Sequence, residues 1–190
     1  MLKLHWASAS PFARKCVVCA QEAGVEMETV ARGGNAIQNA NMPVSENPLG
    51  KIPALERTDG PAIYDSRVIT RYLDSLGGGT LYPEARIWEV LTLEATADGI
   101  MDAALLVVYE KRLRAPDAVF DDWVEAQWAK VERSLDAIES RWMSHLAGPL
   151  DAAQIALACA LSYLDFRLGA RNWRAGRPVL AAWEEAFAKR

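Results

Sequence analysis

A serine at the start of an expected helix is the first feature of this sequence that could do chemistry. Ser10-Pro11-Phe12-Ala13 follows a short alternating segment, and Pro11 suits the first helical position with Ser10 as N-cap. A helix N-terminus presents free backbone N–H groups and about half a positive charge, so it stabilises an anion such as a thiolate. A serine hydroxyl there can donate to that anion. The alternative is that Ser10 only caps the helix.

A second feature is the proline-rich segment 47–55, which reads NPLGKIPAL. Pro53 opens a short expected strand, where a proline is tolerated at a sheet edge or beside a special peptide bond. A cis bond between Ile52 and Pro53 would expose the backbone of Ile52 for pairing with an extended peptide. The sequence leaves the isomer open, because most X–Pro bonds are trans.

A third feature is the pair Asp65-Ser66, which precedes another expected helix. The pair is typical of a helix cap with a favourable acidic residue, and it is also a candidate binding position because a second set of free N–H groups lies there.

Two further patterns favour structural roles. Cys16 and Cys19 form a C-x-x-C spacing, but they fall beyond the first helical turn, so we expect ordinary helix packing rather than redox or metal chemistry. Asp98 and Asp102 lie one helical turn apart without further ligands nearby, which indicates a solvated or interface-facing acidic pair.

Composition limits the class of protein and its partners. The 190 residues are 51% hydrophobic and 24% charged, as in an ordinary globular protein. The net charge of -4 gives no reason to expect nucleic acid or an anionic membrane as partner. An odd number of cysteines, three, fits a reducing cytosol, and two isolated histidines make a zinc site improbable. The N-terminus lacks the apolar core of a signal peptide, and we therefore expect a soluble, cytoplasmic protein without a metal.

The elements that must position these residues change character along the chain. Residues 1–76 alternate between expected strands and helices, with strands at 2–6, 25–30, 52–56 and 62–64 and helices at 11–23 and 66–76. Gly77-Gly78-Gly79 is the clearest linker signal. Helical spacing then continues over 84–113 and 121–146, and Asp151 with Gln154 forms a capping-box pattern before an apolar run. The order predicts an α/β unit joined to an all-α bundle.

Taken together, the motifs resemble those of the glutathione S-transferase family, particularly bacterial members with a serine in the active site. The resemblance covers nearly the whole chain. It rests on SPFARK at 10–15, NPLGKIPAL at 47–55 and YDSR at 64–67, and in the helical half on ADGIMDA at 97–103 and IALACALSYL at 155–164.

The resemblance implies a fold and a reaction. It implies a thioredoxin-like glutathione-binding domain over 1–77 and an all-helical C-terminal domain over 84–190. It also implies a homodimer that activates the thiol of glutathione, its co-substrate, for attack on a small hydrophobic electrophile. An electrophile pocket between the halves is then expected, lined by Trp6, Phe12, Met101, Leu105 and Tyr109.

The resemblance also implies roles for single residues. Pro53 would be the family's cis-proline, Ile52 would pair through its backbone with the cysteinyl residue of glutathione, and Lys51 would be a looser electrostatic contact. Asp65 would meet the γ-glutamyl ammonium group, and Ser66 would hold the γ-glutamyl carboxylate.

Two more roles follow from the resemblance. Asp98 would reach glutathione in the neighbouring subunit. Ser10 would face the sulfur, with Ser8 as the rival because related families place their serine at slightly different offsets.

Two other functions stay open. The chain could be a non-catalytic glutathione-binding or dimeric scaffold module, since a binding site does not require turnover. A glutathione-dependent reductase or peroxidase is less favoured, because Ser10 and Ala13 replace the two thiols of the related glutaredoxin motif.

Overall fold

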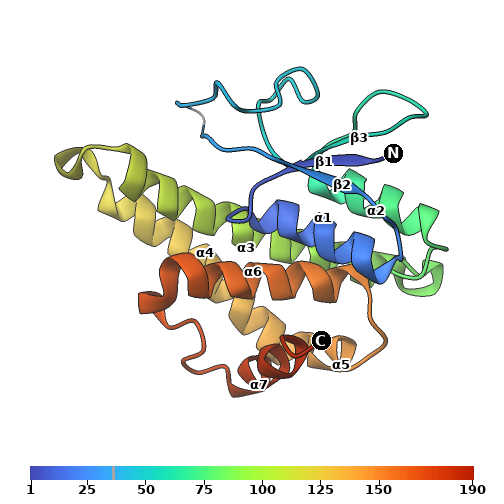
Figure 1. The fold of residues 1–190 in the computed structure, drawn as a ribbon. Helices are drawn as coiled ribbons and strands as arrows, with labels where there is room; N and C mark the ends of the chain where they lie inside the picture. The colour runs from blue at the N-terminus through green and yellow to red at the C-terminus, as the bar shows by residue number, and fades with distance from the viewer. Residues whose placement is uncertain (36) are drawn as a thin grey trace. The chain divides into compact units, whose positions relative to one another are not determined.

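The computed structural model describes residues 1–35 and 37–190 and divides into two compact units, Met1–Val90 and Leu91–Arg190. Within these described ranges, the first contains a three-stranded sheet, two complete α-helices and the start of a third, and the second contains helices but no strand (Figure 1). Among the described residues, no helix is both long and apolar enough to cross a membrane. The predicted α/β half and all-helical half are confirmed.

The sheet of the first unit has the order β2-β1-β3. The central strand β1 runs parallel to β2 and antiparallel to β3. The strand bounds are β1 Lys3–Trp6, β2 Glu28–Ala31 and β3 Ala54–Glu56. The predicted strand at 25–30 therefore begins three residues late, because the N–H of Val25 donates to the carbonyl of Ala20 in the turn that ends the first helix. The predicted strand at 62–64 is reduced to a single bridge between Ile63 and Leu55.

Helices α1 (Pro11–Glu22) and α2 (Ser66–Leu76) lie on the same side of this sheet (Figure 1). A hydrophobic core lies between these helices and the sheet, because each helix turns one apolar side toward the sheet. It is formed by Leu4, Cys16, Ala20, Leu55, Ile69 and Leu73. Gly24 has a φ of +67°, the left-handed conformation that lets the chain leave α1 and turn toward β2.

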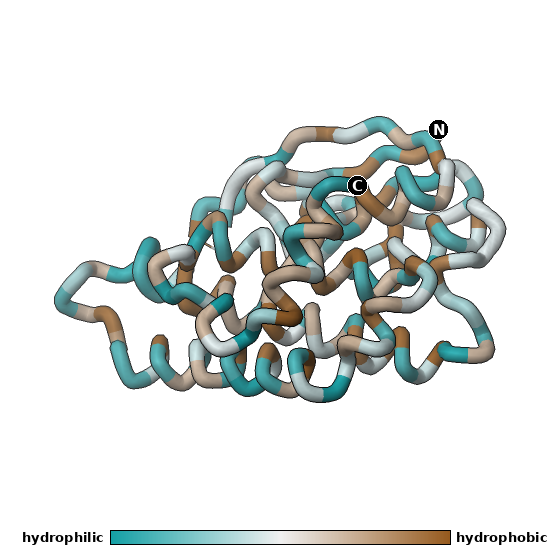
Figure 2. The backbone as a smooth tube through the Cα atoms, turned by 90° about the horizontal axis from the view of Figure 1, so that it is seen from below, coloured by the Kyte–Doolittle hydropathy of each residue, from teal (hydrophilic) through white to brown (hydrophobic). Residues whose placement is uncertain are grey.

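The helices of the second half follow the predicted breaks, with one difference. Their bounds are α3 Ile87–Leu113, α4 Asp121–Arg141, α5 Met143–Leu146, α6 Ala152–Leu168 and α7 Pro178–Phe187. The long helix expected over 121–146 is interrupted at Trp142, so α5 is a separate short turn. Figure 2 shows hydropathy changing within single turns along the helices, as expected where one side of a helix is buried.

Side chains satisfy several helix ends of the second unit. Asp151 caps α6, accepting from the N–H groups of Ala153 and Gln154 at 3.1 and 3.2 Å. The predicted capping box is only half formed, because the Gln154 amide turns away from the cap. It donates instead to carbonyls at the end of α5, those of His145, Leu146 and Gly148. Carbonyls at the end of α5 and just beyond it thus receive a donor from the next helix.

Candidate functional site

Ser10 is the N-cap of α1. Its Oγ accepts a hydrogen bond from the N–H of Ala13 at 3.2 Å, and its own N–H donates to the carbonyl of Ala7 at 2.9 Å. A hydroxyl both accepts and donates, so the cap leaves the Ser10 O–H able to donate to an anion in front of the helix. Ser8 is exposed in the preceding turn, and its side chain has no hydrogen bond within residues 1–35 and 37–190.

The Ile52–Pro53 peptide bond is cis, the isomer that the resemblance implies. Across the part of the chain that the structure describes, the N–H and C=O of Ile52 have no hydrogen-bond partner. An unpaired N–H and C=O on one residue can bind an extended peptide through two backbone hydrogen bonds.

Buried Asn47 shapes the segment that leads to Ile52. Its Nδ2 donates to the carbonyl of Lys51 at 3.0 Å, and its Oδ1 accepts from the N–H of Leu49 at the same distance. Gly50 has a φ of +60°, a conformation that suits the tight turn between them. Sequence reasoning quoted Asn47 only as part of a motif and missed its positioning role. The signal was a turn-forming Asn three residues before a Gly, here Asn47 and Gly50.

Asp65 is the N-cap of α2, accepting from the N–H of Arg67 at 3.0 Å. Its other oxygen pairs with Nη2 of Arg67 at 2.9 Å. Burial raises the pKa of Asp65, but the hydrogen bonds and charge of Arg67 outweigh it, so the pKa is lowered overall and the carboxylate is ionised at neutral pH. An ionised carboxylate here can bind an ammonium group.

Ser66 is the first residue of α2 and is only 2% exposed. Arg67 was not singled out as a site residue from sequence, although it closes the YDSR motif. Its half-exposed guanidinium lies beside the cap, so the start of α2 offers an anion both free N–H groups and a full positive charge.

The sheet and the two helices bring these segments to one region of the first unit. His5 pairs with Ala54 in the antiparallel register. Trp6, which follows His5, and Pro53, which precedes Ala54, therefore lie at the same end of the sheet. The chain then reaches Ser10 four residues after Trp6. The Sγ of Cys16 donates to the carbonyl of Ser66 at 3.8 Å, which joins α1 to the start of α2.

Other predicted site residues have different surroundings. Lys51 is exposed beside Ile52. Asp98 belongs to α3 in the second unit and is 5% exposed; its contact with glutathione of a neighbouring subunit stays a prediction. Cys16 and Cys19 are wholly buried inside α1, so the expectation that they serve helix packing is confirmed.

Among the residues that the structure describes, the fold assembles one group of side chains that could hold a metal, which the sequence spacing did not indicate. Ligand atoms of His5, Glu46 and Glu56 lie within 4.8 Å of one another. However, His5 Nδ1 accepts from Nε of Arg32 at 2.9 Å, so the proton lies on Nε2, which donates to Glu56 at 2.7 Å. Both ring nitrogens are thus engaged, and a cation would have to displace Arg32 before His5 could bind it.

Two family models match the chain. The glutathione S-transferase N-terminal domain matches residues 9–76, and the glutathione S-transferase C-terminal domain matches residues 121–186. The first unit therefore has the thioredoxin-like fold of that N-terminal domain, and the helical unit corresponds to the C-terminal domain.

Individual relatives agree along the whole chain. The GST-like protein YibF of Escherichia coli K12, whose own function is uncharacterized, is 34% identical over 185 residues, spanning 94% of this chain and 90% of that protein. A glutathione transferase family member from Pseudomonas fluorescens Pf-5, solved with bound glutathione, is 42% identical with a TM-score of 0.97, covering 100% of this chain and 95% of the other. A second structure of that bacterial protein holds S-(propanoic acid)-glutathione.

A third relative is a much longer protein, of which the match covers only a part. Elongation factor 1-gamma 2 of rice is 31% identical over 176 residues, which are 87% of this chain but only 40% of the elongation factor. The match to YibF extends over nearly the full length of both proteins, and both halves fit the family's two domain models in order. The chain therefore belongs to the glutathione S-transferase family.

Proposed function

We propose that this protein binds glutathione and activates its thiol for attack on an electrophilic carbon. The observation that carries the proposal is the hydroxyl of Ser10, which caps α1 through its oxygen and keeps its proton free to donate. The glutathione complexes of the Pseudomonas relative support the choice of ligand.

Three parts of the tripeptide would meet groups of matching chemistry. The ammonium of the γ-glutamyl residue pairs with the ionised Asp65. The carboxylate of that residue binds at the start of α2, with Ser66 and the guanidinium of Arg67. The cysteinyl residue pairs with the free backbone groups of Ile52, and Lys51 supplies a looser electrostatic contact.

The sulfur would then lie before the N-terminus of α1. One hydrogen bond to a charged group contributes about 1.5–3 kcal/mol, which corresponds to roughly one to two units of thiol acidification. The helix terminus adds about 0.3–1 kcal/mol. Bound glutathione therefore ionises near neutral pH, and the thiolate is the nucleophile. The sulfur forms the new bond to carbon, the leaving group departs with its electron pair where there is one, and the thiol proton passes to solvent.

A calorimetric titration with glutathione tests the binding step. We expect a single site per chain, and Asp65→Ala weakens the affinity by about 2–5 kcal/mol where the ligand desolvates the ion pair. Asp59→Ala is the matched control, because Asp59 is exposed in the turn between β3 and Ile63. This change should leave the affinity for glutathione unchanged. Equal affinity of the wild-type and Asp65→Ala proteins would remove Asp65 from the site.

A dimer and a cytoplasmic location belong to the same proposal. Apolar side chains are exposed on α2 and at the start of α3, namely Val68, Leu76 and Trp88. A subunit interface over these side chains would remove them from water, which favours association. Three buried free cysteines fit a reducing compartment.

A second candidate function is a non-catalytic domain. The relevant observation is that the rice elongation factor contains a similar stretch as 40% of its length. Turnover of a simple aryl halide with glutathione distinguishes the two functions, because a domain that serves only assembly has no need to raise the reactivity of the thiol.

A further inference from the structure

An arginine without a carboxylate partner lies near the end of α3. Arg112 forms no ion pair within residues 1–35 and 37–190. The acid nearest in sequence, Glu110, is engaged elsewhere, because it pairs with Arg114 and accepts from the N–H of Phe120. The positive charge of Arg112 is therefore not neutralised by its own helix.

A second such arginine lies on α6. The Nε of Arg167 is buried and has no hydrogen-bond partner in the described part of the chain, while its guanidinium stacks 4.1 Å from the centre of the Phe166 ring. The neighbouring acid Asp165 is again engaged elsewhere, accepting from Trp173 Nε1 at 2.8 Å and pairing with Arg174. A buried donor without an acceptor is uncommon in proteins and calls for a ligand or another explanation.

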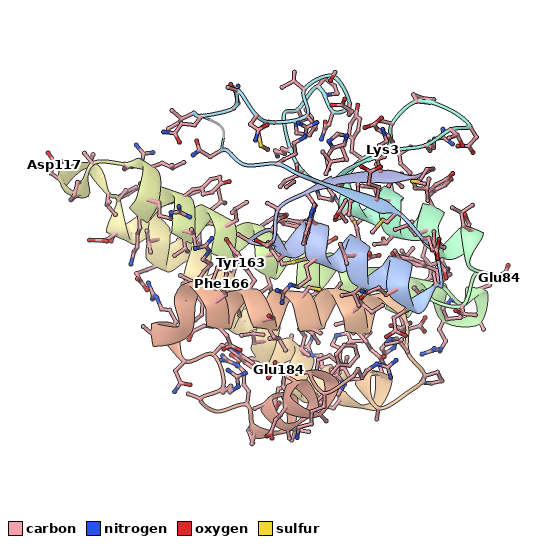
Figure 3. All side chains as sticks on the ribbon, viewed as in Figure 1. Lys3, Glu84, Asp117, Tyr163, Phe166 and Glu184 are labelled. Atoms are coloured by element: carbon pink, nitrogen blue, oxygen red, sulfur yellow. The ribbon has the colours of Figure 1, made fainter. Side chains whose placement is uncertain are left out.

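The phenol of Tyr163 connects the two arginines. It lies one turn before Arg167 on α6 and is 5% exposed. In Figure 3 it lies along the edge of α6 next to α3, and it interacts electrostatically with Arg112 and Tyr109 of α3 as well as with Arg167. Burial raises the pKa of Tyr163, so the phenol stays protonated at neutral pH and can donate a hydrogen bond.

The spacing places each pair of these side chains on one side of its own helix. Tyr109 and Arg112 are separated by three residues on α3, and Tyr163 and Arg167 by four on α6, so each pair shares one side of its helix. The two guanidinium groups offer only donors, and the protonated phenol adds an O–H that can also donate. The planar fork of an arginine matches a carboxylate through two parallel hydrogen bonds.

We propose that Arg112, Tyr163 and Arg167 bind a carboxylate carried by the electrophilic substrate. The preferred electrophile then has an apolar body and an acidic group, rather than being purely hydrophobic. This inference rests on the proposed transferase function, in which Tyr109 beside this cluster is one of the residues expected to line the electrophile pocket.

A matched pair of aryl chlorides tests the preference. In 4-chloro-3-nitrobenzoate and 4-chloro-3-nitrobenzamide, the glutathione sulfur bonds to the ring carbon, chloride leaves with the electrons of the carbon–chlorine bond, and the thiol proton goes to solvent. The two substrates differ only in the charge of the remote group. We expect kcat/KM for the benzoate, relative to the benzamide, to fall about ten- to a hundredfold in Arg167→Gln and in Arg112→Gln.

Arg133→Gln on α4 is the matched control, since it removes one exposed positive charge from the same unit and should leave the ratio of the two kcat/KM values unchanged. Tyr163→Phe should lower the ratio in the same direction with little loss of packing. An equal fall for both substrates, or an unchanged ratio, would overturn the proposal.

Binding separates this inference from the proposed reaction. S-(2-carboxyethyl)glutathione and S-butylglutathione differ in the presence of a carboxylate on the sulfur substituent, and titration with each requires no turnover. We expect Arg167→Gln to weaken only the carboxyethyl compound, about tenfold or more, with glutathione itself as reference. Equal weakening of the affinity for both compounds would refute the carboxylate site even if the enzyme turns over substrates. Selective weakening without any turnover would retain the site and refute the transferase reaction.

Discussion

At the scale of single residues, Ser10 combines two roles in one hydroxyl. Its oxygen satisfies the N–H of Ala13, one of the backbone groups that a helix start leaves unpaired. The proton on the same oxygen is the donor that the proposed thiolate needs. Capping and activation therefore do not compete, and a substitution at this position removes both.

The first prediction separates these roles. Ser10→Ala raises the pKa of bound glutathione by roughly one to two units, because the thiolate loses one charge-assisted hydrogen bond. The conjugation rate near neutral pH then falls about ten- to a hundredfold and partly recovers at higher pH. Thiolate absorbance of the complex, followed against pH, gives the pKa directly.

Ser8→Ala is the control for this experiment, since Ser8 is exposed two residues earlier. A shift of the thiol pKa in the Ser8 variant alone would show that Ser8, and not Ser10, faces the sulfur of glutathione. A loss of about 1 kcal/mol in stability without any change of the thiol pKa would leave Ser10 as a cap only.

The second prediction concerns Asp65 and the pH dependence of stability. Its pKa is lowered in the folded protein, so the ionised group stabilises the fold above the ordinary value of 3.8, and this contribution is lost as the pH falls through the lower folded-state pKa. Asp65→Asn keeps a capping oxygen but removes the charge. We expect the variant to have a lower melting temperature than the wild type at pH 7, and this difference should shrink as the pH falls below 3.8.

Thermal unfolding at a series of pH values measures this difference. Asp117→Asn, at an exposed position, is the control and should follow the wild type throughout. A difference between wild type and Asp65→Asn that grows in acid would contradict the assigned direction of the pKa shift.

Much of the candidate site could be predicted because its determinants are local. A serine before a proline, and an aspartate before a serine, each mark a helix start within a few residues. The role of Arg67 and the pairing of His5 with Glu56 were not predictable, since they depend on side-chain direction and on a contact across 51 positions. The cis isomer at Pro53 came from the family resemblance and not from the residues alone.

At the scale of elements, helix ends of the second unit are satisfied by a distant side chain in one case and by a local one in another. The carboxylate of Glu139 on α4 accepts from the N–H groups of Val179 and Leu180 at 3.1 and 2.7 Å, so α7 is capped by another helix. Asp151, the residue directly before α6, caps that helix, and its second carboxylate oxygen lies 2.9 Å from Nε2 of His145. The first arrangement has no local sequence signature, whereas the cap by Asp151 was predicted from the sequence and its contact with His145 was not.

The third prediction tests the cap of α6. Asp151 is fully buried and satisfies two backbone N–H groups, so Asp151→Ala lowers the free energy of unfolding by at least about 1–2 kcal/mol. Asp151→Asn retains an oxygen acceptor and should recover much of this loss. Urea unfolding measures both, with exposed Asp122→Ala on α4 expected to change stability by less than about 0.5 kcal/mol.

At the scale of the whole molecule, the order of elements was predictable and their division was not. Alternating strands and helices followed by helices alone indicated two kinds of packing layer. The compact units divide at Val90, inside the unbroken helix α3, where no glycine or proline marks a boundary. The functional domain limits of 1–77 and 84–190 stay a prediction based on the linker and the resemblance.

The fourth prediction concerns assembly. Trp88 is 76% exposed at the start of α3, and a charge at that position would be buried without a partner in a dimer that covers it. Trp88→Glu should therefore shift the protein from dimer to monomer in sedimentation equilibrium at micromolar concentration. Phe120→Glu, at another exposed aromatic, is the control that keeps the dimer. A wild-type monomer would contradict the proposed assembly outright.

The carbonyl of Leu146, at the end of α5, accepts from both Gln154 on α6 and the indole N–H of Trp183 on α7. Hydrogen bonds to this one oxygen thus join α5 to α6 and α7. The four residues of α5 are too few to stay helical without these contacts. Amide protons of α5 and of the first turns of α6 should consequently exchange with deuterium as one cooperative group, with the same opening free energy. Gln154→Leu should release α5 first, so that its amides exchange faster while the centre of α6 stays protected.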